Sequence, residues 1–515
     1  MEFSFDLSQG LFSSADIDSG TKLLLKVFSH ILDEDAAAGH LPQRVLDAGC
    51  GVGVIGICAA CALRAASANG QASGVFVHAH DRDELARLIT LHNAAKNHVP
   101  ETALAAFAEP LLAGGTSEAV GASEAVGASI AGGATGGEGG LWDLILSNIP
   151  AKAGTPVLED FIRRSAMLLN PKGRVIVVVV NTLAEMIRRE ITTAASLERE
   201  EAGPEHTVFA YTKKIDVGNS AYVPVKAGPG FLANYPFYVR NVVDCEVEEI
   251  PLHLQTLHGA AGFDQPGGAV LAAAKLLTRI GVKKLNLPLS PPLCETQADA
   301  SHYAPILIHE PGQGFFPCFL LEWLQREYSL RQLPPQMHRL VLSGRNVIAL
   351  EAACHNCDEH NCGRARHNCE HHNYDGAYHN CEYHNYDRAC HNSGAAIVVP
   401  AADLTLGRDA LQKAAECTGG NAGHFGFIAA FPELLPQSSL AKEADQLASL
   451  WESLPPLFTA GGASTAGGAS VTGGVFIAAF SSTDAERFDR KKPFGFTRMG
   501  DIKRKGFRAL AYQYR

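Results

Sequence analysis

The feature that most constrains the fold is a regular alternation of strand-like and helix-like segments over residues 1–214. Helical spacing of apolar residues at 83–97 and 157–169 falls between short apolar runs that are typical of strands. The run RVIVVVV is what a strand buried on both faces requires. This pattern predicts an α/β fold with a mostly parallel, doubly wound Rossmann-like sheet. The strand-like runs are RVLDA (44–48), GVFVHAH (74–80), ALAAF (103–107), WDLILS (142–147), RVIVVVV (174–180) and HTVFAYT (206–212).

The second half of the chain repeats the plan of the first. ILIHEPGQGFFP (306–317) aligns without a gap with VLDAGCGVGVIG (45–56), and FGFIAAFPE (425–433) aligns with WDLILSNIP. Residues 254–277 likewise echo the stretch that contains GLFSSADIDSGTKLLL. Self-similarity on this scale predicts a duplicated domain, and 515 residues suit two domains. We place them at 1–214 and 215–515.

Three segments of biased composition interrupt these domains. Glycine-, serine- and alanine-rich stretches at 113–140 and 459–474 are predicted loop insertions. At 354–393 a His-Asn-Cys unit recurs every 12 residues. Thiols and imidazoles can ligate zinc, but the spacing follows the repeat period and not a closed four-ligand pattern. We therefore favour an expanded repeat in a disordered loop, without a resident metal.

Charge and composition exclude some classes of function. The net charge of −11 disfavours a protein that coats nucleic acid through its overall field, although a local basic patch is compatible with it. The segment MEFSFDLSQG lacks the basic and apolar blocks of a secretory signal, and RVIVVVV is too short to span a bilayer. The cysteines cluster in apolar and repeat segments, which indicates reduced thiols. We expect a soluble cytoplasmic protein without membrane contact.

A glycine-lined turn follows the first strand. In an open α/β sheet this turn presents backbone N–H groups and a helix N-terminus to a ligand, and the glycines let the ligand approach closely. Dinucleotide enzymes also have a glycine turn, so the turn alone is weak evidence. Here the turn begins with the acid Asp47, ahead of Gly49, Gly51 and Gly53, and its spacing differs from a bare G-x-G-x-x-G.

The spacing D-A-G-C-G-V-G after an apolar pair resembles motif I of the class I S-adenosylmethionine-dependent methyltransferases. The resemblance implies that S-adenosyl-L-methionine is the cofactor. It further implies that Asp81, at the end of the second strand, accepts hydrogen bonds from ribose hydroxyls, with Asp83 as the competing candidate and helix capping as the alternative for both. Glu109 is expected at the adenine amine, with an ordinary loop acid as the alternative. Thr21 is expected at the cofactor site, with the start of a helix as its alternative role.

WDLILSNIPAKAG (142–154) resembles the N-P-P-x motif of methyltransferases that act on exocyclic base amines or amide nitrogens. The resemblance implies that the side-chain oxygen of Asn148 and the carbonyl of Ile149 accept the two amine hydrogens, while Pro150 fixes the turn. No strong general base is required. Ile149 stands where the first proline is usual, and Ala151 replaces the common aromatic residue that would stack on a base.

Two stretches, GLFSSADIDSGTKLLL (10–25) and NIPAKAG (148–154), are similar to elements of the small-domain ribosomal RNA guanine-N2 methyltransferases. The similarity implies RNA as the partner and substrate contacts at Phe12 and Lys152. Phe12 is equally suited to a core position, and Lys152 to a solvated one.

The stretch 487–515 carries ten Lys and Arg against two Asp, interleaved with aromatic residues. This composition suits phosphate contacts combined with stacking on unpaired bases, so Lys503, Arg504 and Lys505 are predicted to contact RNA. The alternative is a solvated hairpin whose aromatic residues belong to the core.

In the second domain the cofactor chemistry is missing: Ile308 aligns with Asp47, and Phe431 aligns with Asn148. We therefore expect a degenerate copy that positions RNA. For the whole chain we favour an N-methyltransferase acting on guanine N2 of ribosomal RNA. The alternatives are methylation of protein glutamine or DNA adenine, and a non-catalytic RNA-binding or assembly factor.

Overall fold

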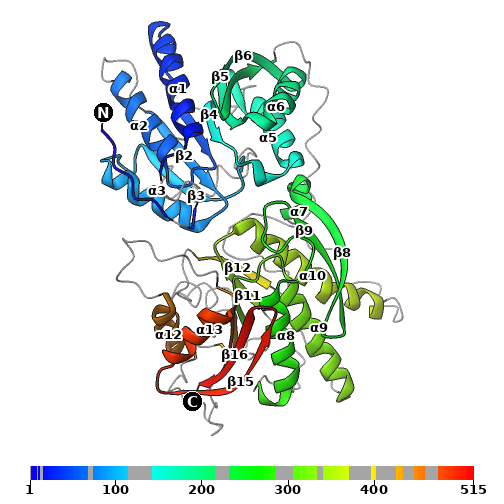
Figure 1. Cartoon of the computed structure of the whole chain (residues 1–515). Helices are drawn as coiled ribbons and strands as arrows, with labels where there is room; N and C mark the ends of the chain where they lie inside the picture. The colour runs from blue at the N-terminus through cyan, green and yellow to red at the C-terminus, as the bar shows by residue number, and fades with distance from the viewer. Residues whose placement is uncertain are drawn as a thin grey trace. The chain divides into compact units, whose positions relative to one another are not determined.

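The computed structural model describes residues 2–8, 10–11, 16–67, 74–113, 142–214, 231–285, 306–332, 340–369, 396–401, 425–432, 446–458 and 474–514. The chain forms two compact units, Met1–Gly228 and Pro229–Arg515 (Figure 1). Phe12, nearly all of the two small-residue insertions and most of the His/Cys repeat lie outside the described residues. The domain boundary expected after residue 214 adjoins residues 215–230, which also lie outside the described residues, so the boundary stays a prediction.

Unit 1 is built on a seven-stranded sheet with the order β3-β2-β1-β4-β5-β7-β6. The first five strands are parallel, and β7 runs antiparallel between β5 and β6. The chain leaves β1 toward β2 and β3, and later returns to pair β4 on the other side of β1. The carboxyl ends of β1 and β4 therefore form the switch point at which such sheets bind ligands. The strands are β1 (Arg44–Ala48), β2 (Phe76–Asp81), β3 (Leu104–Ala108), β4 (Trp142–Asn148), β5 (Leu169–Val180), β6 (Ala195–Ala202) and β7 (His206–Lys213).

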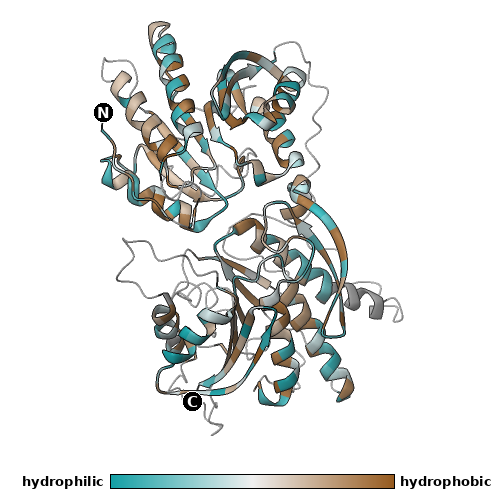
Figure 2. Cartoon of the chain, viewed as in Figure 1, coloured by the Kyte–Doolittle hydropathy of each residue, from teal (hydrophilic) through white to brown (hydrophobic). Residues whose placement is uncertain are grey.

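The helices of unit 1 are α1 (Ser19–Ala37), α2 (Val54–Ser67), α3 (Glu84–Lys96), α5 (Thr155–Met167) and α6 (Asn181–Ala194), with a short 3-10 turn η1 (Ala151–Ala153). Figure 2 shows hydrophobic and hydrophilic residues alternating along α1, whose apolar side packs on β5 and β7. Leu24 and Val27 of α1 share one core cluster with Ile57 of α2 and Ile176 of β5. A hydrogen bond of 2.7 Å between Ser165 Oγ and Tyr211 Oη joins α5 to β7.

Unit 2 contains a second seven-stranded sheet, β12-β11-β10-β13-β14-β16-β15, which repeats the order of the first strand for strand. A separate hairpin of β8 (Val239–Val247) and β9 (Ile250–Leu257) precedes it in the chain. The sheet strands are β10 (Ile306–His309), β11 (Leu340–Gly344), β12 (Ala396–Pro400), β13 (Phe427–Ala430), β14 (Val475–Ser481), β15 (Phe496–Arg504) and β16 (Phe507–Tyr514). The topologies of both sheets confirm the predicted fold class of two tandem doubly wound α/β domains.

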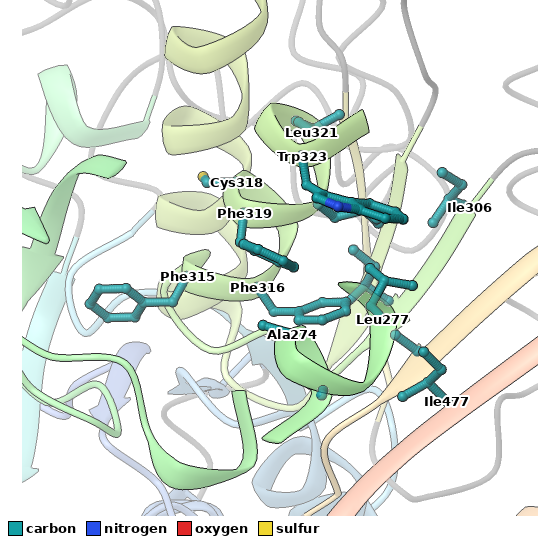
Figure 3. Packing of buried hydrophobic residues seen from close by; sticks show 14 of the residues in the cluster. Ala274, Leu277, Ile306, Phe315, Phe316, Cys318, Phe319, Leu321, Trp323 and Ile477 are labelled. Carbon is teal, nitrogen blue, oxygen red and sulfur yellow. The ribbon is translucent and has the colours of Figure 1, made fainter. Parts of the chain in front are cut away.

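The core of unit 2 is rich in aromatic residues. Phe316, Phe319 and Trp323 of α9 pack beside Ala274 and Leu277 of α8 (Figure 3). The described helices of the unit are α7 (Phe231–Asn234), α8 (Gly268–Ile280), α9 (Phe315–Leu330), α10 (Val347–Cys369), α12 (Gln446–Leu457) and α13 (Ser482–Arg490), with 3-10 turns η2 (Pro236–Tyr238) and η3 (Val282–Lys284).

Two sequence-based expectations need correction. The His/Cys repeat does not begin in a disordered loop, because α10 extends through its first copy to Cys369. In that copy Cys357 is fully buried, and Asn356 bonds the backbone of Gln255 and Gln313. Several aromatic residues of the C-terminal stretch, which includes the β15–β16 hairpin, are core residues and cannot stack on bases. They are Phe496 and Tyr512 of the hairpin, together with Phe488 of the preceding helix α13, all at most 3% exposed.

The following cysteines are free thiols in the structure: Cys50, Cys58, Cys61, Cys245, Cys318, Cys354 and Cys357. Within the described part of the chain, no helix combines the length and the apolar character that a membrane span requires.

Candidate active site

The glycine turn after β1 adopts a backbone that only glycine accepts readily. Gly49, Gly51 and Gly53 have φ values of 85°, 55° and 88°. The N–H groups of Gly49 and Cys50 donate to the carbonyl of His80, at 2.8 and 3.0 Å, which ties the turn to the end of β2. A Cβ atom on Gly51 would meet no atom within 4 Å, so this side of the turn faces open space. The turn thus offers an accessible stretch of backbone to a ligand.

Asp47 lies under this turn as a fully buried carboxylate. Its Oδ2 accepts a 2.8 Å hydrogen bond from the N–H of Gly56, while no described residue bonds its Oδ1. Burial raises the pKa of Asp47 to about 7, an effect that the nearby Asp81 reinforces and the Gly56 bond opposes. A buried carboxylate oxygen without a donor favours a ligand that brings a positive charge or an N–H group.

The structure gives Asp81 and Asp83 different surroundings. Asp81, at the end of β2, accepts from the N–H of Gly51 in the turn at 3.0 Å and from the N–H of Asp83 at 3.0 Å. Burial raises the pKa of Asp81. Asp83 caps α3 by accepting from the N–H of Leu85. Of the two candidates, Asp81 is therefore the one in contact with the glycine turn.

Glu109 lies beside Asp81 at the carboxyl end of the neighbouring strand β3. Its N–H donates to the carbonyl of Asp81 at 2.6 Å, and its carboxylate is 3.8 Å from Nδ1 of His80. Only 6% of Glu109 is exposed. Asp81 and Glu109, the acids predicted to contact the ribose and the adenine of the cofactor, therefore lie at the carboxyl ends of adjacent strands.

Asn148 ends β4, next to β1 in the sheet, and its side chain is held by the start of α1. Its Nδ2 donates to Oδ1 of Asp18 at 3.1 Å and to Oγ1 of Thr21 at 2.9 Å. The Thr21 hydroxyl donates to Oδ2 of Asp18 at 2.7 Å, and the N–H of Thr21 donates to Oδ1 of Asp18, the N-cap of α1. The sequence-based assignment missed Asp18, because it touches Asn148 across 130 positions of the chain.

The residues after Asn148 form a compact turn. Ile149 is 2% exposed, so its side chain is anchored in the core where the motif usually has a proline. Pro150, with φ −66° and ψ 134°, leads into η1, and the turn ends at Gly154 with φ 96°. Lys152 on η1 is exposed to solvent.

The corresponding turn of unit 2 has different chemistry. Gly312 and Gly314 keep positive φ values of 59° and 105°, but Ile308 takes the place of Asp47 and Pro317 takes the place of Gly56. The acceptor and the donor of the Asp47–Gly56 hydrogen bond are therefore both absent. Glu310 in this turn accepts from the N–H of Arg345 after β11.

The basic residues predicted to contact RNA lie on the β15–β16 hairpin. Lys503 and Lys505 are exposed, and the left-handed Lys505 (φ 45°) forms the hairpin turn. Nη1 of Arg504 is 2.6 Å from Oε1 of Glu248. A shallow cleft of about 460 Å³ opens along this edge strand. It is lined by Lys275, Arg279, Asp501, Ile502, Lys503 and Arg504.

Comparisons with known proteins find a family match within the first unit. Residues 2–107 match the methyltransferase small domain. A search of curated proteins found no match.

Among solved structures, a 16S rRNA N2-guanine methyltransferase of Thermus thermophilus aligns over 98% of this chain and 94% of its own, with 13% identity and a TM-score of 0.48. A ribosomal protein L11 methylase of Lactobacillus delbrueckii covers 36% of this chain and 79% of its own (21% identity, TM-score 0.24). The magnesium protoporphyrin IX methyltransferase of Synechocystis covers 38% and 86% (17% identity, TM-score 0.26).

The family match covers motif I, the turn that surrounds Asp47 and the strand that ends at Asp81. The open side of Gly51 and the donor-free oxygen of Asp47 fit the cofactor of that family, which brings an ammonium and a sulfonium. Over residues 2–107 the chain therefore matches the methyltransferase small domain, and the site is that of an S-adenosylmethionine-dependent methyltransferase with S-adenosyl-L-methionine as its cofactor.

Proposed function

We propose that the protein methylates an exocyclic amine of a nucleic-acid base, and specifically N2 of a guanine in ribosomal RNA. The observation that carries the proposal is the placement of Asn148. Its amide ends β4 beside β1, and among the described residues no group donates to its Oδ1. An acceptor at this position can hold an amine N–H at the switch point of the sheet.

Each cofactor residue has a physical role in this proposal. Asp47 receives the positively charged methionine end, Gly49, Gly51 and Gly53 let it approach the backbone, and Asp81 accepts from the ribose hydroxyls. Glu109, at the next strand end, receives the adenine amine. S-adenosylmethionine supplies a methyl carbon bonded to a positively charged sulfur.

Asn148 and Ile149 act on the substrate. Asn148 Oδ1 and the carbonyl of Ile149 accept the two N–H groups of the amine, so that the nitrogen lone pair points at the methyl carbon. The nitrogen–carbon bond forms as the sulfur–carbon bond breaks, and one amine proton then leaves to water. The buried Ile149 and the fixed φ of Pro150 hold this carbonyl in place.

A base within RNA must leave its stack to reach Asn148. Lys152, which is exposed beside this position, is proposed to contact a phosphate of the extruded nucleotide. Phe12 is proposed to contact the same base. The cytoplasm is the proposed location.

Unit 2 is proposed to be a degenerate copy that holds RNA and no cofactor. The loss of both the acceptor at Ile308 and the donor at Pro317 supports this, as does Phe431 at the position of Asn148. The ring of Phe431 lies 4.8 Å from that of Phe316, in surroundings that are apolar instead of hydrogen bonding.

Transfer of labelled methyl from the cofactor to purified ribosomal RNA, DNA and protein tests the substrate class. We expect label in RNA, and digestion to nucleosides should yield N2-methylguanosine. Label in adenine of DNA or in glutamine of protein would replace the proposed substrate while keeping the chemistry.

Asn148→Ala tests catalysis by this site. We expect the rate of methyl transfer to fall by about 100-fold or more, because the amine loses an acceptor that orients it. Cofactor affinity should stay within about twofold of that of the native protein. If the native protein transfers no methyl group to any of these polymers, a non-catalytic RNA-binding role is favoured instead.

A further inference from the structure

We propose that Asp18 and Thr21 are positioning residues that fix the amide of Asn148 with its oxygen facing the substrate amine. The inference rests on the proposed function, because it explains how Asn148 comes to offer an acceptor. It assigns a role to Asp18, a carboxylate at the start of α1 to which the motif spacing gave none.

The direction of the amide follows from which groups can donate. An ionised carboxylate only accepts, so the group of Asn148 that faces Asp18 must be Nδ2. Thr21 has a single hydroxyl proton and donates it to Oδ2 of Asp18 at 2.7 Å, so toward Asn148 it can only accept. Both contacts therefore demand N–H from Asn148, and Oδ1 is left on the opposite side of the amide.

The same contacts oppose the reversed amide. A rotation of 180° would set Oδ1 of Asn148 against the Asp18 carboxylate and lose its bonds to both neighbours. A charged acceptor also strengthens the bond it receives. When Nδ2 donates hydrogen bonds, the polarised N–H groups push electron density toward Oδ1, which makes the amide oxygen a better acceptor for the substrate. Asp18 and Thr21 thus fix both the direction in which Oδ1 of Asn148 points and its strength as an acceptor.

The start of α1 shows how the sequence positions the side chains of Asp18 and Thr21. Asp18 is the N-cap and so has a fixed position. Gly20 leaves room for the first residue of β7, because a Cβ there would lie 2.8 Å from Cδ2 of His206. Thr21, β-branched and 6% exposed, has a restricted χ1 angle. The D-x-G-T element therefore brings a hydroxyl and a carboxylate to the end of β4.

Unit 2 separates the packing role of this element from its polar role. Gly268 starts α8, and a Cβ on it would lie 2.4 Å from Phe507, the first residue of β16. This repeats the contact of Gly20 with the first residue of β7, so the two glycines correspond.

With the glycines aligned, every member of the polar trio formed by Asp18, Thr21 and Asn148 is replaced in unit 2. Pro266 stands for Asp18, Ala269 stands for Thr21, and Phe431 stands for Asn148. The α8 N-cap, Gly267, has no side-chain capping bond. The fold therefore persists without the trio, and its three members are absent together, as expected if they serve the amine and not the packing.

Matched substitutions test the inference. Thr21→Val keeps the shape of the side chain and the backbone N–H that donates to Asp18, but removes the hydroxyl. Thr21→Ser retains a hydroxyl and is the matched control. Asp18→Ser keeps a good N-cap and removes the carboxylate. We expect kcat to fall about 10- to 100-fold in Thr21→Val and Asp18→Ser and to recover to within about threefold in Thr21→Ser, with cofactor affinity unchanged.

A second readout does not depend on activity. With asparagine labelled in its side-chain amide with nitrogen-15, the Asn148 signal is identified by its absence in Asn148→Ala. We expect the two amide protons to exchange slowly in the native protein and faster in Thr21→Val. This measurement applies even if no methyl transfer is found, so failure of the proposed function and failure of the inference are distinguishable.

Each outcome of these measurements either supports the inference or overturns it. Native-like kcat and an unchanged amide signal in both Thr21→Val and Asp18→Ser would overturn the inference. Equal losses in kcat and in cofactor affinity for Thr21→Val would also overturn it, because they would make Thr21 a cofactor contact as its sequence motif implies. A loss confined to kcat, with rescue in Thr21→Ser, supports it.

Discussion

At the scale of single residues, the proposed role of Asp47 depends on its charge state. A carboxylate with an ordinary pKa would be ionised at every physiological pH, but burial raises the pKa of Asp47 to about 7. A positively charged ligand against its Oδ1 would favour the ionised form again. Binding of the cofactor should therefore release a proton near neutral pH, if Asp47 contacts the cofactor's positive charge as we propose.

This coupling predicts a pH-dependent affinity. The cofactor should bind about tenfold more weakly for each pH unit below 7 and with constant affinity above about pH 8. Calorimetric titrations between pH 5.5 and 8.5, in buffers of different ionisation enthalpy, measure both the affinity and the proton release. An affinity that does not change over this range would show that Asp47 does not contact the cofactor's charge.

The same residue has a predicted effect on stability. Because its pKa is raised from 3.8, the folded state resists ionisation of Asp47, and stability should fall as pH rises from about 4 to about 7. Asp47→Asn removes this cost and should raise the free energy of unfolding at pH 8 by at most about 4 kcal/mol, with little effect near pH 4. Urea unfolding at the two pH values checks this. Greater stability combined with lost cofactor binding is the expected signature of a functional carboxylate.

At the scale of elements, α8 and β15 carry the RNA surface that we propose in unit 2. Lys275 and Arg279 lie one turn apart on α8, and neither these nor Lys503 has an ion-pair partner among the described residues. Like charges at this spacing destabilise a helix slightly. The cleft that they line suits a phosphate backbone, to which cations contribute by releasing counterions.

Paired substitutions test this surface. Lys275→Ala with Arg279→Ala should weaken RNA binding and lower the slope of log affinity against log salt by about 2, at unchanged cofactor affinity. The control is Arg490→Ala with Lys491→Ala. It removes the same charge from the last residue and the C-cap of α13, a helix whose Phe488 packs in a different core cluster from that of α8. Equal losses for both pairs would indicate a general effect of net charge and contradict the cleft.

Some elements were predictable from the sequence and others were not, for physical reasons. The strand at 44–48 matches β1 at both ends, because an apolar run between a loop and a glycine turn leaves little choice. β6 was missed, since LEREEA is rich in helix-forming residues. In the structure it is an edge strand whose Glu200 pairs with Arg188 of α6.

The candidate site shows the same division. Motif spacing located Asp47, the glycines and Asn148, since these lie at strand ends that the pattern reveals. Spacing did not reveal that Asp18 and Thr21 hold Asn148, because that contact joins α1 to β4 through side chains alone. Nor did it reveal that Arg504 is engaged by Glu248 of the β8–β9 loop.

At the scale of the whole molecule, two sheets of identical strand order are predicted to bind a single cofactor. Calorimetry should give one S-adenosylmethionine per chain, and Asp47→Asn should abolish the binding instead of leaving a second site. A stoichiometry of two would contradict the proposed loss of the site in unit 2.

The pair Ile308 and Pro317 has a consequence for anyone who would engineer a second cofactor site into unit 2. Ile308→Asp alone would bury a carboxyl group without its N–H donor, and Pro317→Gly alone would supply a donor without its acceptor. Neither substitution is useful by itself, so a designer would have to introduce both at once.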